Sequence, residues 1–134
     1  MKAIADTGFL VAFGNRKDQH HAWAMKLADR VTEPLLTCEA VLAETAFHLG
    51  SSAIALAFVT KGLVRPALVL GDHLIRLTEL ALRYADREPD LADLCLIRLS
   101  ELNPKHPVIT TDLNDFRVYR RGRRETIPLI HPPD

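Results

Sequence analysis

The stretch MKAIADTGFL, residues 1–10, decides how the chain begins to fold and raises the first question about its function. Residues 2–5 are typical of a buried strand, but the run ends at Asp6 and becomes apolar again at Phe9. Burying even a neutral polar group without a partner costs about 2–7 kcal/mol, and an isolated carboxylate costs more. Asp6 therefore needs a partner, and the sequence leaves three open: a backbone N–H, a basic side chain or a metal ion.

The composition is that of a globular protein of ordinary domain size. The chain has 134 residues, 48% hydrophobic and 25% charged, with a formal net charge of zero, so overall charge predicts neither nucleic-acid nor membrane binding. Cys38 and Cys95 form no CxxC pair, which favours core packing over a zinc site or a disulfide. The sequence has neither a secretory signal nor an apolar run of membrane-spanning length, so we expect a cytoplasmic protein.

Apolar runs of strand length alternate with stretches of helical periodicity along the whole chain. The expected strands lie at 3–5, 34–36, the later half of 65–71, 106–111 and 127–130. The expected helices lie at about 18–31, 37–50, 53–62, 73–85 and 90–102. We expect N-caps at Thr37, Ser51 or Ser52, Asp72 and Asp90. This order predicts an α/β fold with helices flanking a mostly parallel sheet.

The ends of two expected strands carry acids. Asp6 follows the first strand, and Asp112 follows the strand at 106–111. Ligands of open parallel sheets bind beyond the carboxyl ends of the strands. We therefore expect Asp6 and Asp112 to converge on one cleft.

Two further acids lie on helices that should bury one face. Glu44 shares its helical face with Ala40, Val41, Phe47 and His48, so it is either a boundary residue or a ligand. Asp93 is the third residue of its helix, where it can complete a capping box or face the cleft at the strand ends. The neighbouring candidates have structural explanations too, since each can cap or stabilise a first helical turn; they are Asp90, Asp112 and Asp115.

Asp6, Glu44, Asp93 and Asp112 come from four separate elements, and no structural role explains all four together. Clustered carboxylates repel one another and raise each other's pKa unless cations intervene. No lysine or arginine adjoins any of the four in sequence. Oxygen ligands without His or Cys favour Mg²⁺ or Mn²⁺ over zinc, so we predict that the partner of Asp6 is a metal ion.

The arrangement of these acids resembles the PIN-domain family, and specifically the VapC-type toxins of toxin–antitoxin pairs. Five segments carry the resemblance in order: IADTGFLVAF, DQHHAWA, LTCEAVLAETAFHLG, YADREPDLADLCLIRLSE and VITTDLNDFRVYRRGRRETIPLI. Two positions depart from the family pattern. Gly8 stands where many members have Ser or Asn, and Leu94 with Cys95 replaces small residues after the third acid.

The resemblance implies that residues 1–134 form a single PIN-like nuclease domain with a three-layer fold. It implies a metal-dependent endoribonuclease, the toxin of a type II toxin–antitoxin pair, which cleaves RNA phosphodiester bonds with metal-activated water. Such a protein would use one or two Mg²⁺ ions, for which Mn²⁺ can substitute, form a homodimer and be inhibited by a cognate antitoxin. The implied catalytic residues and metal ligands are Asp6, Glu44, Asp93 and Asp112, with Asp90, Asp115 and Thr7 as accessory candidates.

A run of arginines follows the last acid, in the segment RVYRRGRRE. Such a run is usually a solvated loop, but beside a nuclease site it would grip the RNA backbone and make binding depend on salt. Tyr119, within the run, can stack on a base or anchor the loop. The residues expected to bind RNA are Arg117, Arg120, Arg121, Arg123 and Arg124.

Other functions fit the sequence less well. A phosphatase of the haloacid dehalogenase type needs a second acid two residues after Asp6, where this chain has Gly8. A receiver-like signalling domain needs a phospho-accepting Asp after a central strand and a suitably placed lysine, and neither is convincing here. The remaining alternative is an inactive PIN-like module that binds RNA or protein without cutting.

Overall fold

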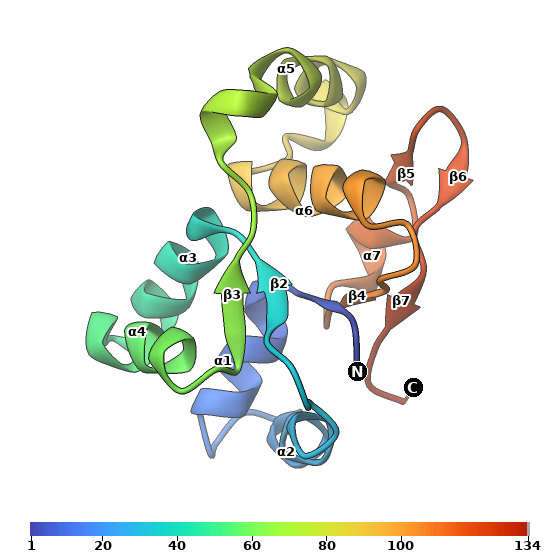
Figure 1. Ribbon diagram of the computed structural model, residues 1–134. Coiled ribbons are helices and arrows are strands. Elements are labelled where there is room, and N and C mark those ends of the chain that lie inside the picture. Colours follow the sequence, from blue (N-terminus) through green and yellow to red (C-terminus); the bar gives the residue numbers. More distant parts are fainter. Residues whose placement is uncertain (134) are drawn as a thin grey trace.

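The computed structural model describes residues 1–133 and contains a five-stranded, fully parallel sheet in the order β3-β2-β1-β4-β7 (Figure 1). Central β1 pairs with β2 on one side and β4 on the other, with Ile4 opposite Leu36 and Val108. The predicted α/β class with a mostly parallel sheet is confirmed. The strands are β1 (Ile4–Ala5), β2 (Leu35–Thr37), β3 (Val64–Pro66), β4 (Val108–Ile109) and β7 (Leu129–Ile130).

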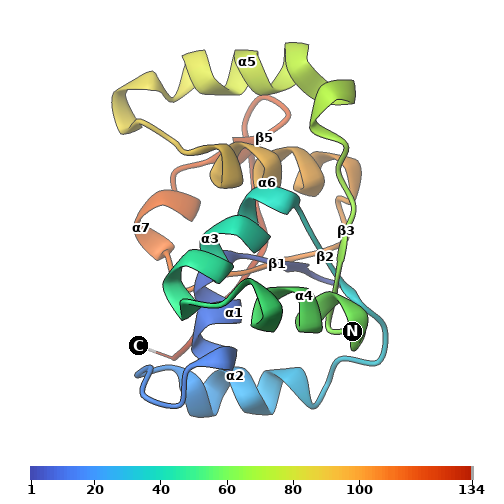
Figure 2. The same ribbon diagram turned by 90° about the vertical axis from the view of Figure 1, so that its left-hand side faces the viewer.

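Helices cover the sheet on both sides, which gives three layers. In Figure 2, α6 and the more distant α5 lie on one side of β1 and β2, and α1 and α2 lie on the other. The helices are α1 (Thr7–Gly14), α2 (His21–Ala28), α3 (Glu39–Leu49), α4 (Ser52–Thr60), α5 (Leu74–Arg83), α6 (Leu91–Leu102) and α7 (Leu113–Phe116). Short 3₁₀ turns and a small antiparallel hairpin complete the fold, namely η1 (Leu70–His73), η2 (Ala85–Arg87), β5 (Arg120–Arg121) and β6 (Glu125–Thr126).

The core lies between the sheet and these helices. Helix α6 buries more than half of its residues, because it packs on the sheet and also against α5 and α3. Its fully buried residues include Leu96, Ile97 and Leu99. No helix within residues 1–133 combines the length and the apolar character that crossing a membrane requires.

Helix α1 was not predicted from the sequence, although it positions the candidate site. Asp6 ends β1 and at once caps α1, because its Oδ1 accepts a 2.7 Å hydrogen bond from the backbone N–H of Thr7. Phe9, Leu10 and Ala12 bury the helix against the core. Gly8 and Gly14 lower the helix propensity of this segment, so burial rather than local preference stabilises it.

Several predicted boundaries are corrected. Thr37 is the last residue of β2 rather than a cap, and its hydroxyl donates to the carbonyl oxygen of Ala5 while Cys38 occupies the N-cap of α3. Asp72 lies in the turn η1, and His73 precedes α5. Strand β3 begins at Val64 and ends at Pro66, so it lies at the start of residues 65–71 rather than in their later half. Pro66 is tolerated there because β3 is an edge strand, where a missing N–H can face away from the ladder.

Candidate metal centre

Asp6 lies at the centre of the candidate site and is 7% exposed. Its Oδ1 accepts from the Thr7 N–H, and its Oδ2 accepts a 2.7 Å hydrogen bond from the hydroxyl of Thr110. Thr110 follows β4, and its own oxygen accepts the N–H of Asp112 at 2.9 Å. The parallel pairing of β1 with β4 thus brings Asp6 and Asp112 to the same end of the sheet. Two neutral donors stabilise Asp6 without supplying a positive charge.

Glu44 approaches from helix α3. Its Oε1 accepts a 2.7 Å hydrogen bond from the hydroxyl of Thr7, so the residue after Asp6 positions the second acid. His48, one helical turn farther along α3, lies on the same side and lowers the pKa of Glu44, but burial outweighs this effect. Thr7 therefore links the acids of β1 and α3.

Asp90 and Asp93 stand at the start of helix α6. Asp90 is the N-cap as predicted, since its Oδ1 accepts the N–H of Asp93 at 2.8 Å. The carboxylate of Asp93 is not used for capping and accepts a 2.9 Å hydrogen bond from the hydroxyl of the fully buried Tyr119. Tyr119 thus anchors its segment and contacts the site, rather than stacking on a base.

Asp112 and Asp115 stand at the start of helix α7. Asp112 caps it by accepting the N–H of Asp115 at 3.2 Å. Asp115 forms an ion pair with Arg87, whose Nη2 lies 3.1 Å from its Oδ1. Among the seven acids and accessory residues predicted for the site, Asp115 has a basic partner within the described chain, whereas Asp6, Glu44, Asp93 and Asp112 have none.

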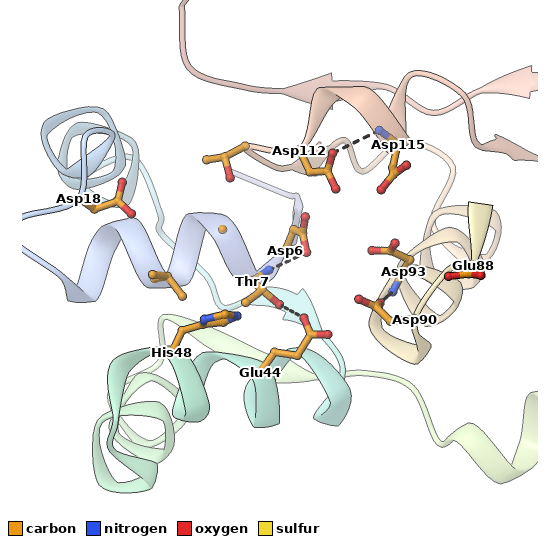
Figure 3. A pocket seen from close by; sticks show the side chains of 13 residues that line it. Asp6, Thr7, Asp18, Glu44, His48, Glu88, Asp90, Asp93, Asp112 and Asp115 are labelled. Carbon is orange, nitrogen blue, oxygen red and sulfur yellow. Dashed lines mark hydrogen bonds between the residues drawn. The ribbon is translucent and has the colours of Figure 1, made fainter. Parts of the chain in front are cut away.

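These side chains surround a single open cavity of about 400 Å³ (Figure 3). Every predicted acid and Thr7 line it, and no lysine or arginine does. Four elements that are distant in sequence, β1, α3, α6 and the β4–α7 connection, each contribute a carboxylate. The residues that line the cavity are Asp6, Thr7, Gly8, Val11, Asp18, Glu44, His48, Glu88, Asp90, Asp93, Thr111, Asp112 and Asp115.

The carboxyls of the cavity are hard to ionise together. Burial, followed by the neighbouring acids, raises the pKa of Asp6 from 3.8 to about 6 against the effect of its two hydrogen bonds. Burial and the charge of Asp90 raise the pKa of Asp93 from 3.8 to about 7. Burial is also the largest cause that raises the pKa values of Glu44 and Asp112. A positive charge in the cavity would relieve this repulsion.

The donor set fits a hard divalent cation, because the cavity offers carboxylate and hydroxyl oxygens of the kind that Mg²⁺ and Mn²⁺ prefer. The side chains are not yet arranged around one ion: within residues 1–133, no group of three or more His, Cys, Asp or Glu side chains is placed to hold a metal. Binding would require carboxylates to rotate inward. The fit therefore lies in the chemistry of the donors rather than in a closed coordination shell.

The structure adds three titratable side chains to the cavity that sequence reasoning did not assign to it. Asp18 lies before α2, His48 lies near the end of α3, and Glu88 adopts a left-handed backbone with φ of 49° before α6. The position of His48 four residues after Glu44 was a usable signal, because both share one helical face. Asp18 and Glu88 belong to connections whose paths depend on the tertiary fold.

The arginines that follow α7 differ in exposure: Arg121 is buried and Arg120 is half-buried, whereas the others are exposed. Arg121 is 6% exposed and donates to Ser100 Oγ at 3.1 Å and to Glu125 at 2.7 Å. The guanidinium of Arg120 donates to three backbone carbonyls at the end of α7, including that of Arg117 at 2.7 Å. The expectation that all five arginines face RNA is therefore revised, since burial removes Arg121. The exposed members are Arg117, Arg123 and Arg124.

Comparison with known proteins agrees with this geometry. Residues 3–121 match the PIN domain family, and the chain belongs to that family. It is also similar to the crystal structure of Mycobacterium tuberculosis VapC20, described as a sarcin–ricin loop cleaving toxin. The two share 22% sequence identity with a TM-score of 0.68, and the match covers 79% of this chain and 86% of the other. No curated protein matches the sequence.

Proposed function

We propose that the protein is a metal-dependent endoribonuclease and the toxin of a type II toxin–antitoxin pair. The observation that carries this proposal is the cavity itself: four carboxylates without basic partners converge on it from four elements. Mutual repulsion between these carboxylates destabilises the folded protein. A function that requires a bound cation explains why the carboxylates are nevertheless gathered here, and membership in the PIN domain family supports such a function.

Asp6, Glu44, Asp93 and Asp112 would hold the cation, directly or through water. When bound, a divalent ion acidifies water and neutralises the negative charge that develops on a phosphate during hydrolysis. The protein's own groups orient the ligands: the hydroxyls of Thr7, Thr110 and Tyr119 each fix one carboxylate. The ligand role of Asp90 and Asp115 is secondary, since one caps α6 and the other pairs with Arg87.

The openness of the cavity suits a polymer rather than a small metabolite, because a strand can cross it without being enclosed. The acids repel phosphate unless a cation is present, so substrate binding and metal binding are expected to be coupled. The exposed Arg117, Arg123 and Arg124 provide positive charge for the RNA backbone outside the cavity.

The remaining parts of the proposal follow from likeness to VapC-type toxins. VapC20 is described as a toxin that cleaves the sarcin–ricin loop. By analogy with such toxins, we propose that a cognate antitoxin inhibits this protein and that the protein forms a homodimer. We also propose that it acts in the cytoplasm and that residues 1–134 form one nuclease domain. An antitoxin-like reading frame beside the coding sequence would support this role at little expense.

The test is RNA cleavage by the purified protein with Mg²⁺ or Mn²⁺. Wild type should cut cellular RNA, chelator should abolish cutting, and Asp6→Asn and Asp93→Asn should reduce it by about 10²–10³-fold, the scale of losing one electrostatic contact to the transition state. Glu33→Gln, in the exposed loop before β2, is the matched control and should cut normally.

A second candidate is an inactive PIN-like module that binds RNA or protein without cutting. It is favoured by the absence, within residues 1–133, of three side chains already placed around a metal position. Under this alternative, wild type and Asp93→Asn would behave identically with metal, and both would retain RNA. Identical behaviour would end the nuclease proposal.

A further inference from the structure

Gly8 and Thr111 meet at the wall of the acidic cavity. Gly8 is the second residue of α1, and Thr111 lies between β4 and α7. A Cβ atom built on Gly8 would overlap the hydroxyl oxygen of Thr111 and would lie 3.2 Å from its Cβ and 3.5 Å from its Cγ2. The hydroxyl of Thr111 therefore occupies the space that a side chain at position 8 would take.

The backbone gives no reason for glycine at this position. Gly50, Gly62 and Gly122 have positive φ, but Gly8 does not, and it lies inside a helix where glycine is less favourable than alanine. The close approach of Thr111 is the feature that a side chain would disrupt. The absence of a side chain at Gly8 thus allows the hydroxyl of Thr111 to occupy this part of the cavity.

The two threonines after β4 have different surroundings. The hydroxyl of Thr110 is fully used, since it donates to Asp6 Oδ2 and accepts from the N–H of Asp112. The hydroxyl of Thr111 makes no hydrogen bond with other groups in residues 1–133, although Thr111 lines the cavity and is half-buried. It is therefore available to a ligand of the cavity.

We propose that Thr111 is a further cation-holding residue of the site, whose hydroxyl contacts the bound divalent ion or its water shell, and that Gly8 is required to place it. This inference rests on the proposed metal dependence. A hydroxyl suits the position because it adds an oxygen donor without adding to the negative charge of eight acids around the cavity. In this role Thr111 helps to hold the ion and to orient its water shell, and it transfers no proton.

The first experiment measures Mn²⁺ affinity by calorimetric titration of the full chain. Thr111→Val keeps the shape of the side chain and removes its oxygen, so it should weaken Mn²⁺ binding by about tenfold, the lower range for losing a supporting group at a metal site. Thr111→Ser restores the oxygen and should return the affinity to within about threefold of wild type, a rescue expected when the hydroxyl itself is the active feature. Unfolding in urea with chelator should show that Thr111→Val stays folded.

A second experiment moves the hydroxyl to the opposite wall. Gly8→Ser alone should weaken Mn²⁺ binding, because its Cβ displaces Thr111 from its observed position. Combined with Thr111→Gly, which vacates the space, Gly8→Ser should recover part of the affinity. Gly8→Ala with Thr111→Gly is the matched control, as it relieves the overlap without returning an oxygen, and it should remain weak.

The outcomes separate this inference from the proposed function. If wild type binds Mn²⁺ and Thr111→Val binds it equally well, the role of Thr111 is refuted while the metal-dependent nuclease stands. If Thr111→Ser is as weak as Thr111→Val, packing rather than the hydroxyl matters, and the inference is again refuted. If wild type binds neither Mn²⁺ nor Mg²⁺, both proposals fall together.

Discussion

The hydroxyl of Tyr119 donates a 2.9 Å hydrogen bond to Oδ2 of Asp93, although the two residues are 26 positions apart. Tyr119 is fully buried, with its ring edge-on to Tyr84 at 5.0 Å and to Phe116 at 5.3 Å. Because the ring cannot move freely, the hydroxyl of Tyr119 fixes the orientation of the Asp93 side chain in the first turn of α6. The bond also lowers the pKa of Asp93, against the larger effect of burial that raises it to about 7.

Tyr119→Phe should therefore shift the acidic limb of the pH–rate profile upward. Without the donor, the pKa of Asp93 rises further, so a larger fraction is protonated at neutral pH and cannot hold a cation. A hydrogen bond to a charged group contributes about 1.5–3 kcal/mol, which corresponds to a shift of about one pH unit or more. RNA cleavage measured from pH 6 to 9 at saturating Mg²⁺ tests this expectation.

Tyr84→Phe is the matched control for Tyr119→Phe. The hydroxyl of Tyr84 accepts the backbone N–H of Arg120 at 2.8 Å and does not contact the cavity. Its loss should lower stability by about 1 kcal/mol and leave the pH profile in place. Equal profiles for both variants would show that Tyr119 acts through packing alone.

Asp6→Asn should stabilise the metal-free protein at pH 8 and have little effect near pH 3.5. Folding raises the pKa of Asp6 from 3.8 to about 6, so the folded state prefers the protonated acid. The stability associated with that proton is present below pH 4 and lost as pH rises through 6. At about 1.4 kcal/mol per pKa unit, the gain from the amide at pH 8 is on the order of 2–3 kcal/mol. Urea unfolding in chelator at both pH values measures it.

Excess Mg²⁺ should reverse that order at pH 8. A ligand that binds the folded state alone at about 1,000 times its Kd adds about 4.1 kcal/mol to the stability of wild type, which exceeds the advantage of about 2–3 kcal/mol that the amide gives without metal. Asp6→Asn, lacking one ligand, should gain much less. A wild type whose unfolding midpoint is the same with Mg²⁺ as with chelator would contradict a metal-holding role for the cavity.

The acids of the site were predictable because each one breaks a local pattern. Asp6 interrupts an apolar strand, Glu44 lies on an apolar helical face, and Asp112 follows a strand that runs parallel to the first. Parallel pairing then brings the strand-end acids to one cavity with no further information. The contacts of Tyr119 and Thr111 were not predictable, because they depend on how segments of unknown path pack against α6 and α1.

Errors in the predicted elements have local causes. Thr37 and Asp72 are residue types that cap helices well, but β2 extends through Thr37, and a 3₁₀ turn takes up Asp72 before α5 begins. Pro66 was expected to confine strand pairing to the later half of residues 65–71. That restriction applies to a central strand but not to the edge strand β3. Tertiary position decided each case.

Exposed and buried arginines of one run should behave differently when replaced. Arg124→Ala removes a positive charge from the surface, so it should weaken RNA binding and reduce the slope of log K against log salt by about 0.7, the value for one phosphate contact on a single strand. Arg121→Ala instead leaves Ser100 and the core without a partner and should lower stability by about 2–4 kcal/mol. Binding at several salt concentrations, with urea unfolding of both variants, distinguishes them. If neither variant changes the slope of log K against log salt, the RNA does not bind at this arginine run.

Glu101, at the far end of α6 from Asp93, should matter for stability rather than for the site. Its carboxylate is 8% exposed and accepts hydrogen bonds from Arg76 at 2.9 Å, Arg98 at 3.2 Å and the N–H of Gly122 at 2.7 Å. These bonds tie the β5–β6 hairpin to α5 and α6. Glu101→Gln keeps one acceptor but loses the charge, and it should lower stability by about 2–4 kcal/mol, somewhat below the cost of breaking a buried ion pair.

Glu79 provides the control for Glu101, because it pairs with the same Arg76 at 3.1 Å but is 57% exposed. Glu79→Gln should cost at most about 0.5 kcal/mol, as expected for a solvated pair on a helix. Both variants should bind Mn²⁺ like wild type, since neither residue lines the acidic cavity. Equal urea midpoints for the two would mean that the buried network around Glu101 stabilises the hairpin no more than a surface ion pair does. A weakened Mn²⁺ affinity in Glu101→Gln alone would instead show that the hairpin positions Tyr119, and through it Asp93.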